Sequence, residues 1–351
     1  MSLFEEHISG PVRFGQIRIY KGIPIPLKKL SKITNYIEKG QNIIIAGKST
    51  SGKASFMDYI YFINVFKWWH DLPSEVRPQI KMFYFSMKLS TRMKLQKWLC
   101  LYLKLEYNMV IDIPTLNNGV GKLYELDAED KEKISSAYTF FTDLENGPLT
   151  LVSGKQTPTN IFNRVSDYMK TIGRLDEHGS FSLDQKHEDQ HTFVYVDNVD
   201  YLQTETDNFS MLPPDMLKRK FGEYIEAFRD VYKITSVIIA PSRPSFTRIA
   251  RETEPTYKEL GLLNDVANIG IVLYNPFNEN NTKYGGYPIN DMVIRGKNRF
   301  RGVSVVRNIQ GLENVSVGSF FIGECGFFAE SPHPNEPDMF EEKIEMLRSL
   351  P

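Results

Sequence analysis

The sequence predicts an α/β fold in which helices flank a mostly parallel central sheet. Short apolar runs with the length and composition of buried strands occur at residues 42–46, 82–86, 149–152, 192–197 and 236–240. Segments with apolar side chains at helical spacing lie between most of these runs, and such alternation is typical of a parallel sheet. The run at 192–197 (TFVYVD) is apolar almost throughout, as expected of a central strand that is covered on both faces.

Helical spacing of apolar side chains predicts the helices of this fold. They are expected over residues 27–38, 54–70, 90–103, 128–144, 160–172 and 221–231. Gly40 follows the first segment, in a position where glycine often ends a helix. Glu129 and Asp130 open the fourth, and their negative charges suit the N-terminal end of a helix dipole.

The remaining segments are predicted as later strands and connections. Further strands are expected at residues 268–274, 291–295, 303–308 and 319–322. Residues 173–191 are charged and contain glycine, which predicts a loop, and the Asn, Gly and Pro residues of 275–290 predict a surface connection.

Composition limits the class of protein. The 351 residues with 41% hydrophobic content suffice for a sizeable core, and the net charge of −1 means that nucleic-acid binding would need a local basic surface. Cys100 and Cys325 are far apart, which argues against a disulfide framework; we interpret both as small buried hydrophobic residues in a reducing compartment. Neither a signal peptide nor a membrane span is recognisable, so we expect a cytoplasmic protein with no membrane partner.

The loop between the first predicted sheet strand and its helix fits a phosphate-binding P-loop. Its residues are Gly47, Lys48, Ser49, Thr50, Ser51, Gly52, Lys53, Ala54 and Ser55. Gly47 and Gly52 allow backbone N–H groups to converge on phosphates, and Lys53 adds a positive charge. We therefore expect residues 47–55 to bind a nucleotide. A flexible Gly/Ser turn that binds nothing is the alternative, and the flanking strand and helix favour the P-loop.

One position of this loop departs from the pattern. A Ser or Thr hydroxyl directly after the lysine would bind Mg²⁺, and here that residue is Ala54. Ser55 lies one position further along the helix. Asp197 ends the apolar strand at 192–197, where a P-loop protein has a carboxylate that holds Mg²⁺ directly or through water. We expect Ser55 and Asp197 to be metal ligands, with a turn or cap role as the alternative for Asp197.

In their order along the chain, the motifs resemble the RecA-like motor domain of DnaB-type replicative helicases, particularly the compact phage-encoded forms. The residues that carry the resemblance are 47–55, 85–90, 194–197, 201–203, 239–243, 259–274 and 296–302. This suggests a lead-in with a short helix over residues 1–40, a RecA-like P-loop domain over 41–330 and a peripheral C-terminal arm over 331–351. We expect a form without the N-terminal primase-interacting domain.

The resemblance implies a homohexameric ring in a bacterial cell or phage-infected host. ATP and Mg²⁺ would lie between neighbouring subunits, and single-stranded DNA would pass through the centre. Lys297 and Arg299 match residues that reach the neighbour's γ-phosphate in that family. The alternative is that both are ordinary solvated charges at a strand edge.

The resemblance also suggests a DNA-binding segment. Residues 242–259 match the region of the central DNA-binding loops, and Arg243, Arg248, Arg251 and Lys258 supply positive charge there. Nearby glutamates nearly balance these charges.

Three positions depart from those of an active motor. Lys88 stands where the family has the glutamate that polarises water, and Pro241 stands where it has a glutamine that senses the γ-phosphate. Together with Ala54, these losses argue against hydrolysis at a useful rate. A shifted register in which Glu106 or Asp58 serves as the base is the less favoured alternative.

Two functions remain open. One is an ATP-driven helicase in DNA replication, distinguished by DNA-stimulated hydrolysis; the other is a catalytically inactive RecA-fold relative that forms rings or recruits partners. The fold supports both. The retained Lys53, Asp197, Lys297 and Arg299 favour ATP binding. We therefore predict a DnaB-like protein that binds ATP and single-stranded DNA, with inefficient hydrolysis.

Overall fold

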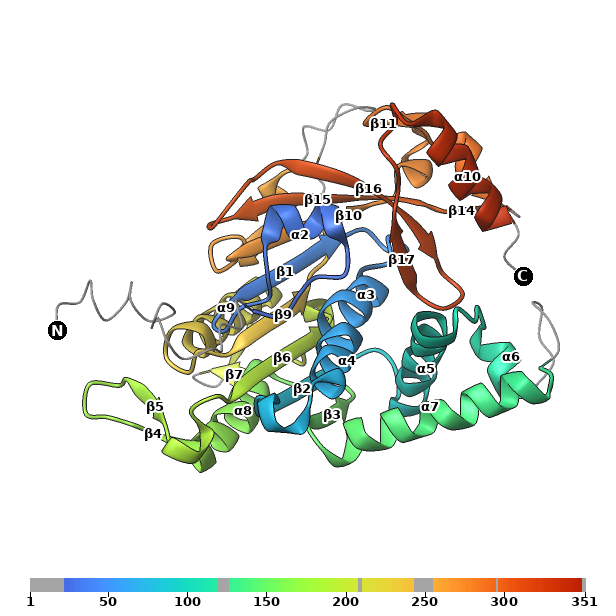
Figure 1. Cartoon of the computed structure of the whole chain (residues 1–351). Helices are drawn as coiled ribbons and strands as arrows, with labels where there is room; N and C mark the ends of the chain where they lie inside the picture. The colour runs from blue at the N-terminus through green and yellow to red at the C-terminus, as the bar shows by residue number, and fades with distance from the viewer. Residues whose placement is uncertain (1–21, 119–125, 208–209, 243–254, 295, 349–351) are drawn as a thin grey trace, which may run out of the picture.

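A large twisted sheet forms the centre of the molecule (Figure 1). The computed structural model describes residues 22–118, 126–207, 210–242, 255–294 and 296–348. In order across the sheet, its strands are β17 (Phe327–Glu330), β16 (Val315–Ile322), β15 (Phe300–Asn308), β10 (Ile269–Tyr274), β1 (Asn42–Gly47), β9 (Thr235–Ile239), β6 (His191–Asp197), β2 (Ile80–Ser86) and β3 (Leu149–Ser153). The strands from β10 to β3 run parallel, and β15, β16 and β17 add an antiparallel edge. The predicted mostly parallel sheet is confirmed.

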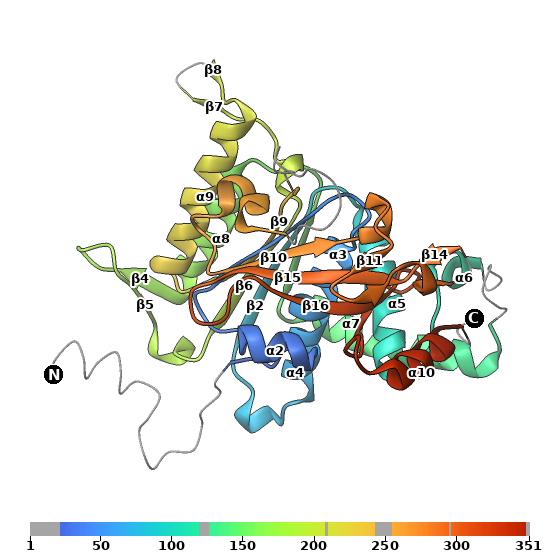
Figure 2. The same cartoon turned by 90° about the horizontal axis from the view of Figure 1, so that it is seen from above.

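Helices cover both faces of the sheet (Figure 2). One face carries α2 (Lys28–Thr34), α4 (Asn64–Asp71), α5 (Thr91–Tyr107) and α7 (Ala128–Asn146), and the other carries α8 (Pro158–Ile172) and α9 (Pro214–Asp230). Alternation along β1 explains the two layers, because Ile43 and Ile45 join one apolar core while Ile44 and Ala46 join the other. A strand buried on both faces is apolar at every position, which is why the sequence signal was strong.

The helix after β1 changes type along its length. It begins as α3 (Lys53–Phe56), continues as a π-helical segment over Met57–Ile63 and ends as α4. The predicted helix over 54–70 is thus confirmed in extent, and its middle is wound more widely than an α-helix. All residues of the π-helical segment are buried, and the Tyr61 carbonyl accepts a hydrogen bond of 2.6 Å from the Tyr195 hydroxyl of β6.

Several segments differ from the sequence predictions. The charged loop predicted over 173–191 contains a hairpin of β4 (Gly173–Leu175) and β5 (Phe181–Leu183). Its turn is built by Asp176, whose carboxylate accepts hydrogen bonds of 2.8 Å from the backbone N–H groups of His178 and Ser180. The helix predicted over 221–231 begins earlier, at Pro214, because Pro is well suited to a first helical turn.

Further short elements complete the fold. The strand predicted over 291–295 is only β13 (Val293–Ile294), which pairs with β14 (Lys297–Asn298). The helix α6 (Ile113–Asn118) and the strand β17 were not predicted. The other small elements are β7 (Thr206–Asp207), β8 (Ser210–Met211), β11 (Lys283–Tyr284), β12 (Tyr287–Pro288) and short 3₁₀ helices at Ser74–Val76, Gln185–His187, Val199–Tyr201, Tyr257–Leu263 (η5, kinked at Gly261), Pro276–Glu279 and Asn290–Met292.

The C-terminal helix α10 (Pro337–Arg348) shares the main core. Phe340, Ile344 and Leu347 are buried in it, and the Phe340 ring centroid lies 5.9 Å from that of Phe320 in β16. The segment that the sequence suggested as a peripheral arm is therefore packed against the sheet. Within the described ranges, no helix combines the length and apolar character needed to cross a membrane.

Replacing Phe340 by Ala should lower the free energy of unfolding by about 3 kcal/mol, because it removes a buried ring and leaves a cavity. Met339→Ala is the matched control, since Met339 is exposed on the same helix and its loss should cost less than about 0.5 kcal/mol. Urea denaturation followed by circular dichroism measures both. Equal effects of the two substitutions would contradict the packing of α10 into the core.

Candidate nucleotide-binding site

The P-loop leaves the carboxyl end of β1 through two glycines that accept no side chain. A Cβ atom on Gly47 would lie 2.5 Å from the Leu273 carbonyl oxygen and 2.7 Å from Ser51 Oγ. Gly52 has a φ of 94°, in the left-handed region, and a Cβ there would lie 2.9 Å from the Phe328 ring. The loop is thus held tightly against β10 and β17 while its backbone turns into α3.

Lys53 curls over this loop. Its ammonium donates hydrogen bonds to the carbonyl oxygens of Gly47, at 2.5 Å, and Lys48, at 2.9 Å. Burial lowers the pKa of Lys53 to about 8, a shift that Asp197 and Asp200 oppose and that Lys88 reinforces. The charge of Lys53 is therefore held where a phosphate would stabilise it.

Asp197 ends β6 at the same edge of the sheet and is bound by a lysine that the sequence analysis did not single out. Lys94 of α5 lies with its ammonium 3.1 Å from Asp197 Oδ2 and 2.9 Å from Asp58 Oδ2. Asp58, on the π-helical segment, also accepts a 2.6 Å hydrogen bond from the Tyr84 hydroxyl. We call Asp58, Lys94 and Asp197 the buried triad.

The three charges of the buried triad are almost completely removed from solvent. Lys94 has no exposed surface, and Asp58 and Asp197 are 4% and 7% exposed. Burial alone would lower the pKa of Lys94, but the carboxylates of Asp58 and Asp197 outweigh it and raise that pKa above its usual value. Lys94 is therefore a permanently charged partner of Asp197.

The residues around Asp197 do not fit a Mg²⁺ site of the usual P-loop kind. The Lys94 ammonium forms an ion pair with Oδ2 of Asp197, so this oxygen already has a cationic partner. Ala54 supplies no hydroxyl ligand for a metal ion. No group of three or more His, Cys, Asp or Glu side chains suited to a metal occurs in the described ranges. The metal roles predicted for Ser55 and Asp197 have no direct support in this geometry.

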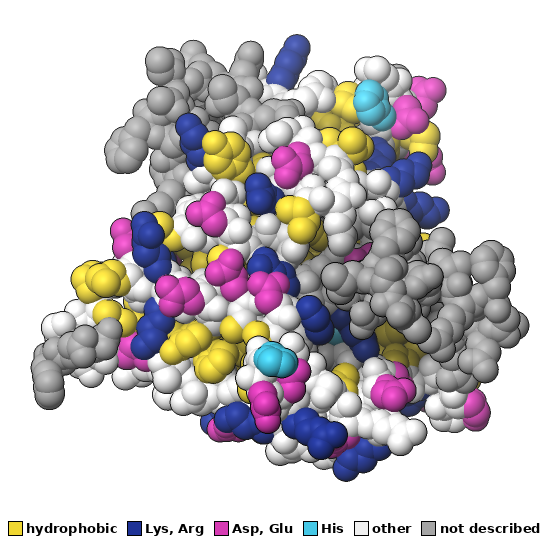
Figure 3. Space-filling view, turned by 90° about the vertical axis from the view of Figure 1, so that its left-hand side faces the viewer, with side chains coloured by type: hydrophobic (Ala, Val, Ile, Leu, Met, Phe, Trp, Pro, Cys, Tyr) yellow, Lys and Arg dark blue, Asp and Glu magenta, His cyan; other side chains and the backbone are white. Residues whose placement is uncertain are grey.

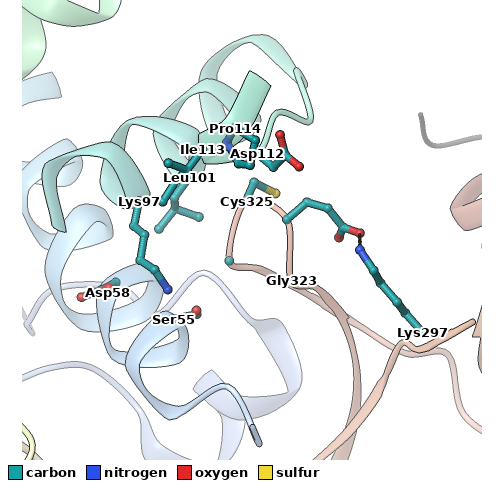
Figure 4. A pocket seen from close by; sticks show the side chains of 12 residues that line it. Ser55, Asp58, Lys97, Leu101, Asp112, Ile113, Pro114, Lys297, Gly323 and Cys325 are labelled. Carbon is teal, nitrogen blue, oxygen red and sulfur yellow. Dashed lines mark hydrogen bonds and ion pairs between the residues drawn. The ribbon is translucent and has the colours of Figure 1, made fainter. Parts of the chain in front are cut away.

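Ser55 lies beside the turn between β16 and β17. A Cβ on Gly326 would lie 3.2 Å from Ser55 Oγ. Ser55 lines a pocket of about 290 Å³ together with Asp58, Lys97 and Lys297 (Figure 4). The hydroxyl one residue after Ala54 thus faces this pocket.

The two other departures from an active motor lie close to the P-loop. Lys88 follows β2, and its charge lowers the pKa of Lys53. Pro241 follows β9, and the next residue, Ser242, donates its backbone N–H to the Gly47 carbonyl oxygen at 3.1 Å. The tertiary structure therefore brings these predicted positions to one place.

A second pocket, of about 360 Å³, lies against the P-loop on the β10 side. Its lining includes Ser51, Glu259 and Asn278. Asn278 donates a 2.9 Å hydrogen bond to Thr50 Oγ1. The buried hydroxyl of Ser51 has no hydrogen-bond partner among the described residues, which leaves a polar group available to a ligand.

Lys297 and Arg299 converge on one carboxylate within the same chain. The ammonium of Lys297 lies 2.7 Å from Glu324, and the Arg299 guanidinium binds both oxygens of Glu324 at 2.5 and 3.0 Å. Lys297 is exposed, whereas Arg299 is buried. To reach a neighbour's nucleotide, Arg299 would have to leave Glu324.

Arg301 is a further cation near the loop. It is 6% exposed, lies with its guanidinium 5.0 Å from the Phe321 ring centroid and donates a long hydrogen bond of 3.5 Å to the Thr50 carbonyl oxygen. Burial, with a smaller contribution from Arg299, lowers the pKa of Arg301 to about 10. Arg301 therefore adds positive charge beneath the P-loop.

Only one of the predicted DNA-binding residues can be placed. Lys258 is exposed in η5, whereas Arg243, Arg248 and Arg251 lie outside the described residues. On the face seen in Figure 3, basic and acidic side chains of the described residues are interspersed. That face offers no extended basic surface among those residues.

The sequence did contain a signal for the buried triad. Lys94 lies four residues before Trp98 and seven before Leu101, on the side of α5 that is buried. A lysine on the apolar side of a predicted helix indicates a buried ion pair, because an unpaired ammonium would be costly there. Its partners, however, come from distant segments and only the fold identifies them.

Solved structures share this architecture. The structure described as "ATPase Domain of G40P" matches with a TM-score of 0.62 and 14% sequence identity, over 94% of this chain and 96% of that one. The fold is that of a DnaB-like helicase ATPase domain. "The Structure Of A DnaB-Like Replicative Helicase And Its Interactions With Primase" matches with a TM-score of 0.61 and 14% identity, over 93% of this chain and 64% of that one.

Sequence comparison adds nothing to this likeness. No model of a known protein family matches the chain, and neither does any curated protein. At 14% identity the DnaB-like likeness establishes the fold, and the chemistry of the site rests on the residues of this chain.

The low pKa of Lys53 predicts that phosphate binding weakens with rising pH. Between about pH 7 and pH 9 the ammonium loses its proton, so the dissociation constant for ATP should rise by about tenfold. Isothermal titration calorimetry measures this change. Lys53→Arg is the control, because arginine stays charged throughout. A pH-independent affinity in the original protein would contradict the role of Lys53.

The Arg299–Glu324 contact predicts a large loss of stability in Glu324→Gln. Removing the carboxylate leaves Arg299 buried without its counter-charge, and we expect unfolding to become easier by about 3 kcal/mol. Burial opposes ionisation of Glu324, but Arg299 and Lys297 outweigh it and lower its pKa to about 2. This stabilisation is therefore complete above the ordinary carboxyl pKa and is lost as the pH falls toward 2.

Urea denaturation at neutral and acidic pH measures this effect. Lys297→Met is the control, because Lys297 is 62% exposed and its removal should cost less than about 1 kcal/mol. Equal stability of Glu324→Gln and the original protein at neutral pH would refute the prediction.

Proposed function

We propose that this chain is a DnaB-like P-loop protein that binds ATP and hydrolyses it slowly or not at all. The observation that carries the proposal is the arrangement of Gly47, Gly52 and Lys53 at the carboxyl end of β1, in the electrostatic reach of Asp197. Ligands of open parallel sheets bind at the carboxyl ends of the strands, and this loop can direct N–H groups and an ammonium at phosphates there.

Charge and hydrogen-bonding capacity near the loop support a nucleotide. Lys53, Lys88 and Arg301 lie near or around the loop, and their positive charges favour a polyphosphate. The adjoining pocket contains the unpartnered hydroxyl of Ser51. A nucleotide could bind its phosphates at the loop and extend into this pocket.

Slow hydrolysis follows from the side chains that would handle water and phosphate. Lys88 replaces a carboxylate with an ammonium group, which has no lone pair to accept a proton, and Pro241 has neither a side-chain amide nor a backbone N–H to donate. Losing the general base at the position of Lys88 would typically lower the rate by about 100-fold or more. Lys94 should lower the hydrolysis rate further, because it forms an ion pair with Asp197, the carboxylate that would otherwise hold a metal.

The fold likeness also motivates a role with single-stranded DNA in replication. We propose assembly into a homo-oligomeric ring in which the positive side chains of residues 243–258 bind the DNA. Positive side chains in this segment would contact phosphates, so binding should weaken with salt.

A second function is favoured by the contact between Lys94 and Asp197. A chain whose metal-binding carboxylate is neutralised could use nucleotide binding to form a ring or recruit partners without a catalytic cycle. DNA-stimulated hydrolysis is what separates a motor from such a structural protein.

The deciding experiment measures ATP binding by calorimetry and ATP hydrolysis with and without single-stranded DNA. We expect binding and little turnover. Lys53→Ala should weaken binding by about tenfold or more, because it removes a charged donor to the phosphates. Lys170→Ala, an exposed lysine on α8, is the control and should leave binding unchanged. Failure of the original protein to bind ATP would refute the proposal, and rapid DNA-stimulated turnover would identify a working motor.

A further inference from the structure

The buried triad places an ammonium group where P-loop proteins use a metal ion. Lys94 contacts the carboxylate that ends β6, and the helix that follows the P-loop supplies the second carboxylate, Asp58. All three side chains are at least nine-tenths buried. The ammonium therefore cannot leave Asp197 without breaking contacts to two separate elements.

Additional contacts keep this ammonium in place. Its nitrogen lies 4.6 Å from the ring centroid of Tyr84 and 5.8 Å from that of Trp98, which suits a cation above aromatic rings. The Tyr84 hydroxyl fixes the other oxygen of Asp58. Two carboxylates and two aromatic rings thus hold the ammonium of Lys94 in place.

The charges of the triad leave one negative charge in excess. Two carboxylates face one ammonium, and Asp197 still attracts the ammonium of Lys53 across the P-loop. A divalent cation at Asp197 would lie beside Lys94 and be repelled by it, and Ala54 would give it no hydroxyl ligand. With Lys53 counted, two ammonium groups balance the two carboxylates, so Asp58 and Asp197 need no metal ion as a counter-charge.

We propose that Lys94 replaces the divalent cation, so that the P-loop binds the nucleoside triphosphate itself and not its magnesium complex. This inference rests on the proposed ATP binding. Lys53, Lys88 and Arg301 supply the positive charge that the metal would otherwise bring to the phosphates, while Lys94 takes the place of the metal beside Asp197. Asp197 serves as a positioning residue for Lys94 and Lys53 and not as a metal ligand.

The competing explanation is that the triad only stabilises the fold. A buried ion pair of that kind would leave the metal requirement of nucleotide binding unchanged. The two explanations therefore differ in how the affinity for ATP responds to Mg²⁺.

Calorimetry with ATP in EDTA and in excess Mg²⁺ tests the proposal on the full chain. We expect dissociation constants within about twofold of each other. Binding that is tenfold or more tighter in Mg²⁺ would overturn the inference while leaving the proposed ATP binding intact. Absence of binding in both conditions would refute the proposed function, and this inference with it.

Lys94→Met should create a metal requirement. The variant keeps Asp58 and Asp197 but removes the ammonium, so ATP affinity in EDTA should fall at least tenfold and Mg²⁺ should restore it. Lys170→Met, on α8 and with a side chain that is 61% exposed, is the control and should behave like the original protein. Metal-independent binding of normal strength in Lys94→Met would overturn the inference.

A double variant keeps the test valid if Lys94→Met alone fails to fold. Lys94→Met leaves two buried carboxylates without a counter-charge, whereas Asp58→Asn with Lys94→Met leaves only Asp197 charged and keeps an acceptor for Tyr84. We expect the same gain of metal dependence in this double variant, with circular dichroism confirming its fold. Metal-independent binding of normal strength there would equally overturn the inference.

Discussion

The candidate site depends on the two ion pairs that the ammonium of Lys94 makes with Asp58 and Asp197. The ammonium connects α5 to the helix after the P-loop through Asp58 and to β6 through Asp197, so three elements that are distant in sequence are held at one point. Burying three charges is costly unless each has partners, and here every charge has at least one. The contact places Lys94 where the sheet, the P-loop helix and the site meet.

The second constraint is the close approach of backbone around the P-loop. Gly47 lies against the Leu273 carbonyl and Gly52 against Phe328, so β10 and β17 limit how the loop can turn. The antiparallel strands β15, β16 and β17 extend the sheet beyond β10 and bring Arg301 and Glu324 toward the loop and its helix. The antiparallel edge of the sheet thus contributes side chains to the candidate site.

The fold of this protein is that of an ATPase domain, whereas several residues around its P-loop differ from those expected of an active ATPase. The chain has a DnaB-like ATPase fold, yet it differs at three positions where the resemblance to DnaB-type helicases implies groups for water, metal and the γ-phosphate. Ala54, Lys88 and Pro241 lie around one loop, and Lys94 is added to them. These differences at one site, with the fold retained, are the reason why we propose a binding role and not a catalytic cycle.

Local patterns in the sequence determined the P-loop, the parallel strands and most helices, because buried strands are apolar at every position and glycine is needed where a Cβ would clash. The same patterns failed at the hairpin of β4 and β5, where a single Asp176 carboxylate builds the turn within a charged segment. Lys94 could be recognised as a buried lysine from its spacing to Trp98. Only the tertiary structure identified Asp58 and Asp197 as its partners, because ion pairs between distant segments depend on how the helices pack on the sheet and leave no local pattern.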